Sequence, residues 1–102
     1  MNIGIDIVEC ERCGGLITAK IFAASELEYI KSKNNALDTV AGLYAAKEAY
    51  FKAKGTGIIK SQLPQVVIAH DELGKPYYAN EPQSSLSISH TATTAVAVCI
   101  IF

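Results

Sequence analysis

The chain has 102 residues and a formal net charge of -1; half of its residues are apolar and 19% are charged. This composition is typical of one small globular domain and does not suggest nucleic-acid binding. The longest apolar run, residues 95–102, is too short to cross a bilayer and fits a buried strand. A chain this small and apolar often covers part of its surface in an oligomer.

The N-terminal residues do not have a signal-peptide pattern, because Asp6 and Glu9 interrupt the apolar run. We therefore expect a cytoplasmic protein whose three cysteines, an odd number, are reduced thiols. Cys10 and Cys13 have the spacing of a redox pair or of half a zinc site. The other candidate zinc ligands, which lack ligand-like spacing, are His70, His90 and Cys99. We interpret the Cys-x-x-Cys spacing as chance.

Residues 2–8 predict a β-strand, because Ile3, Ile5 and Ile7 alternate with smaller or polar residues. Asp6 then projects from the face opposite the isoleucines, together with Gly4. Aspartate is depleted in strands. From the spacing alone, a position at a strand edge or bulge is the favoured interpretation of Asp6, and a functional carboxylate is the alternative.

Two helices are expected next in the chain. A helix-like stretch from Glu9 is broken by two glycines, and Ser25 followed by Glu28 predicts a capping box that opens a short helix. A longer helix is predicted over residues 37–54, with Gly55 as its C-terminal cap.

Glu48 and Lys52 lie four residues apart in the longer helix and so share one face with part of its apolar row. An exposed i,i+4 ion pair is the common interpretation of this spacing. Two carboxylates and an ammonium would also suit a magnesium-bound diphosphate. The second interpretation requires that the fold bring Asp6 to Glu48.

The second half of the chain predicts antiparallel strands. Residues 65–69 and 77–79 are expected to pair around a turn at 71–76. Residues 86–90 and 93–102 follow, joined by a tight connection. The expected fold over residues 1–102 is a single α+β domain, in which a small antiparallel sheet packs against the long helix.

Several blocks of this sequence, taken in order, resemble the holo-acyl-carrier-protein synthases, the short group of the 4'-phosphopantetheinyl transferase superfamily. The blocks are Gly4-Ile5-Asp6-Ile7-Val8-Glu9, Ala45-Ala46-Lys47-Glu48-Ala49 with Lys52, Gly55-Thr56-Gly57-Ile58, Gly74-Lys75-Pro76 and Ser87-Ile88-Ser89-His90. The resemblance covers nearly the whole chain. It implies magnesium-dependent transfer of the 4'-phosphopantetheine arm of coenzyme A to a serine of an apo acyl carrier protein, with adenosine 3',5'-bisphosphate as the other product.

The resemblance also implies residue roles. Asp6 and Glu48 would bind Mg²⁺, and Glu48 and Lys52 would be catalytic, with the serine proton taken by Glu48 or by a metal-bound water. Arg12 would dock the acidic carrier protein. The implied coenzyme A-binding residues are Lys52, Lys47, Gly55, Lys75, Pro76 and His90. The resemblance further implies a homotrimer with active sites between neighbouring subunits.

Two departures from the family pattern motivate other hypotheses. Leu43 stands where the family commonly has an arginine that contributes to binding coenzyme phosphates, and Lys60 is a candidate to compensate. The segment between Arg12 and Ser25, which helps to receive the carrier protein, is shorter than usual. One alternative is a degenerate member that binds coenzyme A or a nucleotide without transfer. Another is an oligomerising structural module. For His90, a turn position is the alternative.

Overall fold

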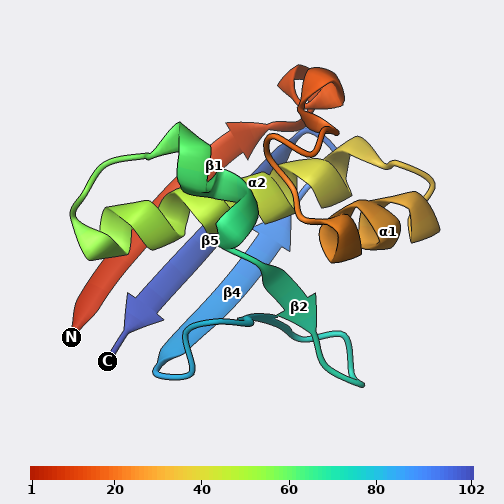
Figure 1. Ribbon diagram of the computed structural model, residues 1–102. Helices are drawn as coiled ribbons and strands as arrows, with labels where there is room; N and C mark the ends of the chain where they lie inside the picture. Colours follow the sequence, from red (N-terminus) through yellow and green to blue (C-terminus); the bar gives the residue numbers. More distant parts are fainter.

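A three-stranded antiparallel sheet with one long helix across it forms the centre of the computed structural model, which describes residues 1–102 and confirms the predicted α+β class (Figure 1). The elements are β1 (Asn2–Glu9), η1 (Cys10–Arg12), η2 (Gly14–Leu16), α1 (Ala24–Ser32), α2 (Leu37–Lys54), η3 (Lys60–Gln65), β2 (Ile68–His70), β3 (Pro76–Tyr78), β4 (Ser84–His90) and β5 (Thr94–Ile101), where η marks a 3-10 helix.

The sheet order is β1-β5-β4, and β2 and β3 form a separate two-stranded hairpin. In the central strand, Ala97 pairs with Asp6 on one side and with Ile88 on the other. The β5 side chains that face α2 are small and fully buried, namely Ala95, Ala97 and Cys99. Small residues here allow the helix to approach the sheet closely, and the alanines of α2 meet them from the other side.

Gly4 sets the distance between β1 and α2. A Cβ atom at this position would lie 2.0 Å from the carbonyl oxygen of Ala49 and 2.5 Å from the amide nitrogen of Ala53. Only glycine therefore permits this contact between strand and helix. The close approach brings Asp6, the next residue on the same strand face, against α2.

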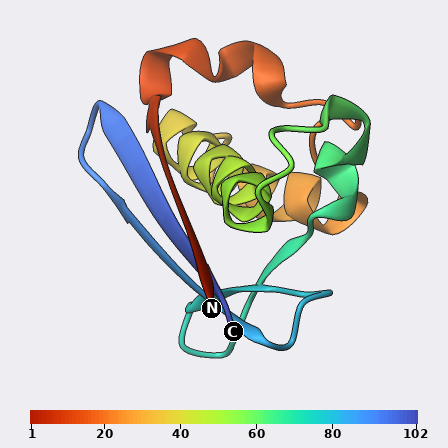
Figure 2. The ribbon, with the colours of Figure 1, turned by 90° about the vertical axis from the view of Figure 1, so that its left-hand side faces the viewer.

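The other face of the sheet is uncovered. Figure 2 shows the helices on one side of the sheet and no element on the opposite side. The alternation predicted for β1 is confirmed, since Asp6 is buried whereas Ile3, Ile5 and Ile7 are 67%, 58% and 70% exposed. By register, Val98 lies beside Ile5 on this face. The uncovered face is therefore apolar along β1 and β5.

The predicted helix over residues 37–54 is confirmed, and Gly55 ends it in the left-handed conformation with φ 74°. The predicted capping box of Ser25 and Glu28 is wrong: the cap residue is Ala23, whose N–H donates to Glu26 Oε1 at 2.8 Å. No helix in the structure is both long enough and apolar enough to span a membrane.

Two further expectations are corrected. Most of the predicted strand over residues 65–69 is not a strand, because η3 continues through Gln65 and pairing with β3 begins only at Ile68. The stretch after Glu9 forms two separate 3-10 turns instead of an α-helical one. These turns carry the chain past the end of β1 and toward α1.

Candidate functional site

Asp6 of β1 and Lys52 of α2 form an ion pair across the interface between strand and helix. Lys52 Nζ donates to Asp6 Oδ1 at 2.9 Å, and the Asp6 side chain is 10% exposed whereas that of Lys52 is 49% exposed. The ammonium is thus anchored at one carboxylate oxygen and still accessible to an anion from solvent. The close approach at Gly4 makes this pairing possible.

Glu48 lies one turn before Lys52 and faces the same aspartate. Burial is the main reason why the pKa of Glu48 rises to about 7, and the neighbouring Asp6 carboxylate adds to the rise. Lys52 partly opposes this increase. The structure therefore brings together Asp6, Glu48 and Lys52, as the magnesium hypothesis requires.

The two carboxylates fit a divalent cation. Asp6 Oδ2 is buried and has no hydrogen-bond partner, which is costly for a carboxylate oxygen. No cluster of three or more acidic, histidine or cysteine side chains exists that could enclose a metal completely. Magnesium commonly takes only one or two protein carboxylates and keeps its other positions for water and substrate phosphates. The donor set thus suits magnesium better than zinc, and Cys10 and Cys13 are free, buried thiols.

A pocket of about 370 Å³ opens beside Glu48. Its lining includes Tyr44, Arg12 and the apolar residues at the end of β1. The Arg12 side chain is 79% exposed and its Nε lies 3.7 Å from Glu9 Oε2. The residue predicted to dock the carrier protein is therefore at the rim of the pocket that contains Glu48.

Tyr44 is a member of this site that the sequence analysis missed. Tyr44 lines the same pocket as Glu48, and burial followed by the charge of Glu48 raises the pKa of the Tyr44 hydroxyl. The spacing of four residues on one helix face is the signal that could have identified it. An aromatic residue on the apolar row of α2 is more often interpreted as core packing.

His90 and Pro76 line a different pocket, of about 210 Å³, together with Leu43 and Gly42 of α2. Asp38, which the sequence analysis did not single out, places Oδ2 3.6 Å from His90 Nδ1. In the same pocket the rings of His70 and of Tyr29 in α1 stack, with 3.9 Å between their centroids. Leu43 is 2% exposed, so an apolar side chain fills the space expected to hold an arginine.

The predicted site residues thus fall into two groups within one chain. The pocket beside Glu48 lies along β1, the pocket with His90 lies along β4, and no residue lines both. β1 and β4 are the two outer strands of the sheet with β5 between them, and α2 contributes residues to both pockets. Lys75 is exposed in the turn before β3, and Gly55 is exposed at the C-terminal end of α2.

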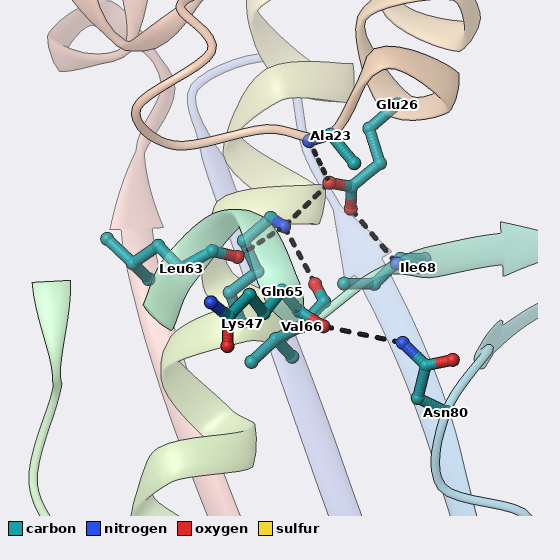
Figure 3. Close-up of polar contacts among 8 residues, drawn as sticks. All are labelled: Ala23, Glu26, Lys47, Leu63, Gln65, Val66, Ile68 and Asn80. Carbon is teal, nitrogen blue, oxygen red and sulfur yellow. Dashed lines mark hydrogen bonds and ion pairs between the residues drawn. The ribbon is translucent and has the colours of Figure 1, made fainter. Parts of the chain in front are cut away.

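One of the predicted coenzyme contacts, Lys47, is contradicted. Lys47 is wrong, because its side chain is 0% exposed and Nζ donates to Glu26 Oε1 at 2.7 Å and to the carbonyl oxygens of Leu63 and Val66 at 2.8 and 2.7 Å (Figure 3). All three ammonium hydrogens are used, so none is free for a phosphate. Lys60 lines another pocket and does not replace the missing charge next to Leu43 within one chain.

Comparisons with known proteins show which proteins this chain is similar to. A family model described as the 4'-phosphopantetheinyl transferase superfamily matches residues 2–99. The chain is 39% identical to the holo-[acyl-carrier-protein] synthase of Alkaliphilus oremlandii, with 97% of this chain and 96% of that relative covered. The corresponding enzyme of Fusobacterium nucleatum is 37% identical, with coverage of 99% and 98%.

Solved structures show the same likeness. A holo-(acyl-carrier-protein) synthase from Bacillus anthracis in complex with CoA (3',5'-ADP) superposes with a TM-score of 0.86 at 36% identity, covering 98% of this chain and 94% of that one. The Helicobacter pylori synthase in complex with coenzyme A gives a TM-score of 0.79 at 30% identity, with coverage of 98% and 99%.

Proposed function

This chain belongs to the holo-acyl-carrier-protein synthases of the 4'-phosphopantetheinyl transferase superfamily, and we propose that it carries out their reaction at the site formed by Asp6, Glu48 and Lys52. The reaction transfers the 4'-phosphopantetheine arm of coenzyme A to a serine of an apo acyl carrier protein. The observation that carries the assignment is the convergence of Asp6 with Glu48 and Lys52, which follow it by more than forty residues in the sequence.

Asp6 and Glu48 are the residues that would hold magnesium, and the orphaned Asp6 Oδ2 is the oxygen that most needs a cation. When bound, the metal supplies charge neutralisation on the oxygens of the pyrophosphate. Lys52 adds a second positive charge from the protein, because its half-exposed ammonium can contact phosphate while it still pairs with Asp6.

The serine hydroxyl must lose its proton as its oxygen bonds to the phosphorus of the pantetheine phosphate. The bond from this phosphorus to the bridging oxygen breaks, and adenosine 3',5'-bisphosphate leaves with that oxygen. We propose that this proton goes to Glu48 or to a metal-bound water. The pKa of about 7 that burial and the Asp6 carboxylate give Glu48 belongs to the metal-free site, and a bound cation would lower it.

We further propose that the chain works as a homotrimer in which a neighbouring subunit completes each site. Two features support this assembly. The uncovered sheet face exposes Ile3, Ile5 and Ile7, which is an unusual amount of apolar surface for a monomer of this size. The pockets of Glu48 and His90 lie along opposite outer strands, so in the proposed trimer a coenzyme molecule would meet the Glu48 pocket of one subunit and the His90 pocket of its neighbour.

The three free, buried thiols fit a reducing compartment, and we place the enzyme in the cytoplasm. Leu43 favours one competing function, a protein that binds coenzyme A but does not transfer its arm. It removes a positive charge from the pocket that contains His90. A test of function must therefore separate binding from turnover.

The test mixes the protein with coenzyme A, magnesium and an apo acyl carrier protein, and weighs the carrier by intact mass spectrometry. We expect the carrier to gain one phosphopantetheine arm, and the gain to disappear with a chelator and in the Glu48→Gln variant. Calorimetric binding of coenzyme A is measured in parallel. Binding without any mass gain on several carriers would establish the binding-only function. Full activity of Glu48→Gln would refute the assignment of the site.

A further inference from the structure

Lys47 and Glu26 form an ion pair inside the protein, with 0% of either side chain exposed. Both members of the pair also form hydrogen bonds with backbone groups. Lys47 uses its remaining hydrogens for the carbonyls of Leu63 and Val66, at the end of η3 and just after it. It therefore joins α1, α2 and the segment that leads into β2 (Figure 3).

Glu26 satisfies backbone donors from two further places. Its Oε1 accepts from the N–H of Ala23 at 2.8 Å, besides the bond from Lys47, and its Oε2 accepts from the N–H of Ile68 at 2.9 Å. The carboxylate thus fixes the last residue before α1 and the first residue of β2. Figure 3 shows these contacts converging on the two side chains from separate elements.

A buried ion pair is weak evidence for stability. Moving two charges out of water costs several kcal/mol per ion, and replacing such a pair by apolar residues is often neutral or stabilising. The arrangement is therefore better explained by the positions that it fixes. The carbonyl oxygens of Leu63 and Val66 also require a hydrogen-bond donor at residue 47.

The pair fixes two segments, and each would face one of the two substrates of the proposed reaction. Phe22 and Ala23 end the segment that starts at Arg12, and the Phe22 ring lies 5.3 Å from Lys47 Nζ. Ile68 begins the β2–β3 hairpin, whose turn leads to Pro76 in the pocket with His90.

The catalytic carboxylate is adjacent to the pair. Glu48 directly follows Lys47 on α2, so the pair is built on the same helical turn as the proposed metal site. A shift of the backbone at residue 47 would move both substrate-facing segments relative to Glu48.

We propose that Glu26 and Lys47 are positioning residues that hold the carrier-docking segment, residues 13–23, and the coenzyme-facing turn, residues 71–76, in place relative to Glu48. Being fully buried, neither side chain touches a substrate. The inference rests on the proposed function, since the two segments are defined by the substrates they would meet. It assigns Lys47 a role different from the coenzyme contact expected from the sequence.

The decisive variant is Glu26→Gln combined with Lys47→Met. It removes both buried charges at nearly constant volume and leaves only the neutral carbonyl oxygens of Leu63 and Val66 without their donor, whereas Lys47→Met alone also strands the Glu26 charge. Circular dichroism checks that the double variant folds. The matched control is Lys54→Met, which breaks the exposed ion pair between Lys54 and Glu81 on the same helix, with N to O distance 3.0 Å.

We expect the KM values for coenzyme A and for the carrier protein each to rise roughly tenfold in the double variant, with a much smaller change in kcat. Hydrogen exchange of the unliganded protein should accelerate at residues 13–23 and 66–76 and stay unchanged at residues 45–52. The Lys54→Met control should show neither effect.

A folded double variant with unchanged KM values and unchanged exchange would overturn the proposal, as would a loss confined to kcat. Hydrogen exchange needs no turnover, so it still tests the coupling if the wild-type protein proves inactive. Inactive wild-type protein would refute the proposed function, and accelerated exchange would then leave the structural coupling established.

Discussion

Lys52 donates to Asp6 across the boundary between α2 and β1, and this leaves Glu48, one turn earlier on the same helix, without an ion-pair partner. The common i,i+4 pairing of Glu48 with Lys52 is absent. Lys52 neutralises the Asp6 carboxylate, whereas the Glu48 carboxylate beside Asp6 has no cation paired with it. Burial and this unpaired arrangement together raise the pKa of Glu48, and the two carboxylates with one ammonium leave the site in need of a further cation.

The first prediction concerns stability against pH in metal-free buffer. The folded-state pKa of Glu48, about 7, lies above its ordinary value of 4.5, so the folded protein binds the proton more tightly than the unfolded chain does. The resulting stability is fully present below pH 4.5 and is lost as the pH rises through 7. Urea unfolding of Glu48→Gln should show greater stability than wild type at pH 8.

The same experiment carries its own control. Glu48→Gln should differ little from wild type at pH 5, where Glu48 is already largely protonated, and Glu72→Gln in the exposed turn before β3 should behave as wild type at both pH values. An equal effect of Glu48→Gln at pH 5 and pH 8 would show that the carboxylate is not the source of the pH dependence.

The second prediction concerns metal binding. Magnesium requires the ionised form of Glu48, so its binding should strengthen between pH 6 and pH 8, and the Tm shift on adding magnesium should grow accordingly. Asp6→Asn should abolish the shift, because it removes the charge of the buried carboxylate whose Oδ2 lacks a partner. A magnesium-induced shift that persists in Asp6→Asn would place the metal elsewhere.

The third prediction concerns Gly4. It tests the spacing between β1 and α2 separately from the charges of the two carboxylates. Gly4→Ala inserts a Cβ atom 2.0 Å from the Ala49 carbonyl oxygen, so strand and helix must move apart. Overpacking of this kind costs about 1–3 kcal/mol or more. The control Gly14→Ala meets no atom within 4 Å and should be close to neutral in the same unfolding experiment.

A second outcome distinguishes misplacement from simple loss of stability. If Gly4 sets the distance between Asp6 and α2, the folded fraction of Gly4→Ala should lose the magnesium-dependent Tm shift together with its stability. Retention of the full shift would show that the site tolerates a wider spacing of β1 and α2.

Much of the fold could be predicted because local signals agreed with tertiary packing. The bounds of α2 follow from its apolar row and from Gly55, whose positive φ suits a glycine cap. The start of α1 could not be predicted in this way. Glu26 serves as the third helical residue behind Ala23, and an alanine carries no side-chain cap signal. A segment containing Pro64 likewise formed η3 in place of a strand.

The site was predicted from motifs, whereas the packing around it was not. Asp6, Glu48 and Lys52 do converge, as expected. Lys47 is next to Glu48 in the same motif, but its side chain is buried in the protein interior instead of facing the site. Burial of an ammonium depends on acceptors that distant segments contribute. Sequence spacing within α2 contains no information about Glu26 or about the carbonyls near residue 65.

The fourth prediction concerns assembly. Ile5→Asp places a charge in the middle of the uncovered apolar face, next to Val98, and should convert the proposed trimer to monomers as measured by light scattering after gel filtration. Leu73→Asp is the control, since Leu73 is 96% exposed in a turn away from the sheet. Its assembly should equal that of wild type. A trimer that survives Ile5→Asp would show that this sheet face is not the contact.

The fifth prediction concerns Arg12 and the carrier protein. Arg12 lies at the rim of the pocket with Glu48, 79% exposed, and its contact with Glu9 spans 3.7 Å. A surface pair of this kind contributes little to stability, so Arg12→Ala should keep the Tm of wild type. Removing the charge should raise the KM for the acidic carrier several-fold at low salt, and by less at high salt, because salt screens such attraction. The KM for coenzyme A should not change.

Replacing Glu9 should change the KM for the carrier protein in the opposite direction. Glu9→Gln removes a negative charge beside Arg12 and frees the guanidinium, so the KM for the carrier should fall. Lys31→Ala, an exposed cation at the end of α1, serves as the control for net charge. Equal increases in KM for Arg12→Ala and Lys31→Ala would indicate a diffuse charge effect. A specific increase for Arg12→Ala with a decrease for Glu9→Gln would locate carrier docking at the rim of the pocket that contains Glu48.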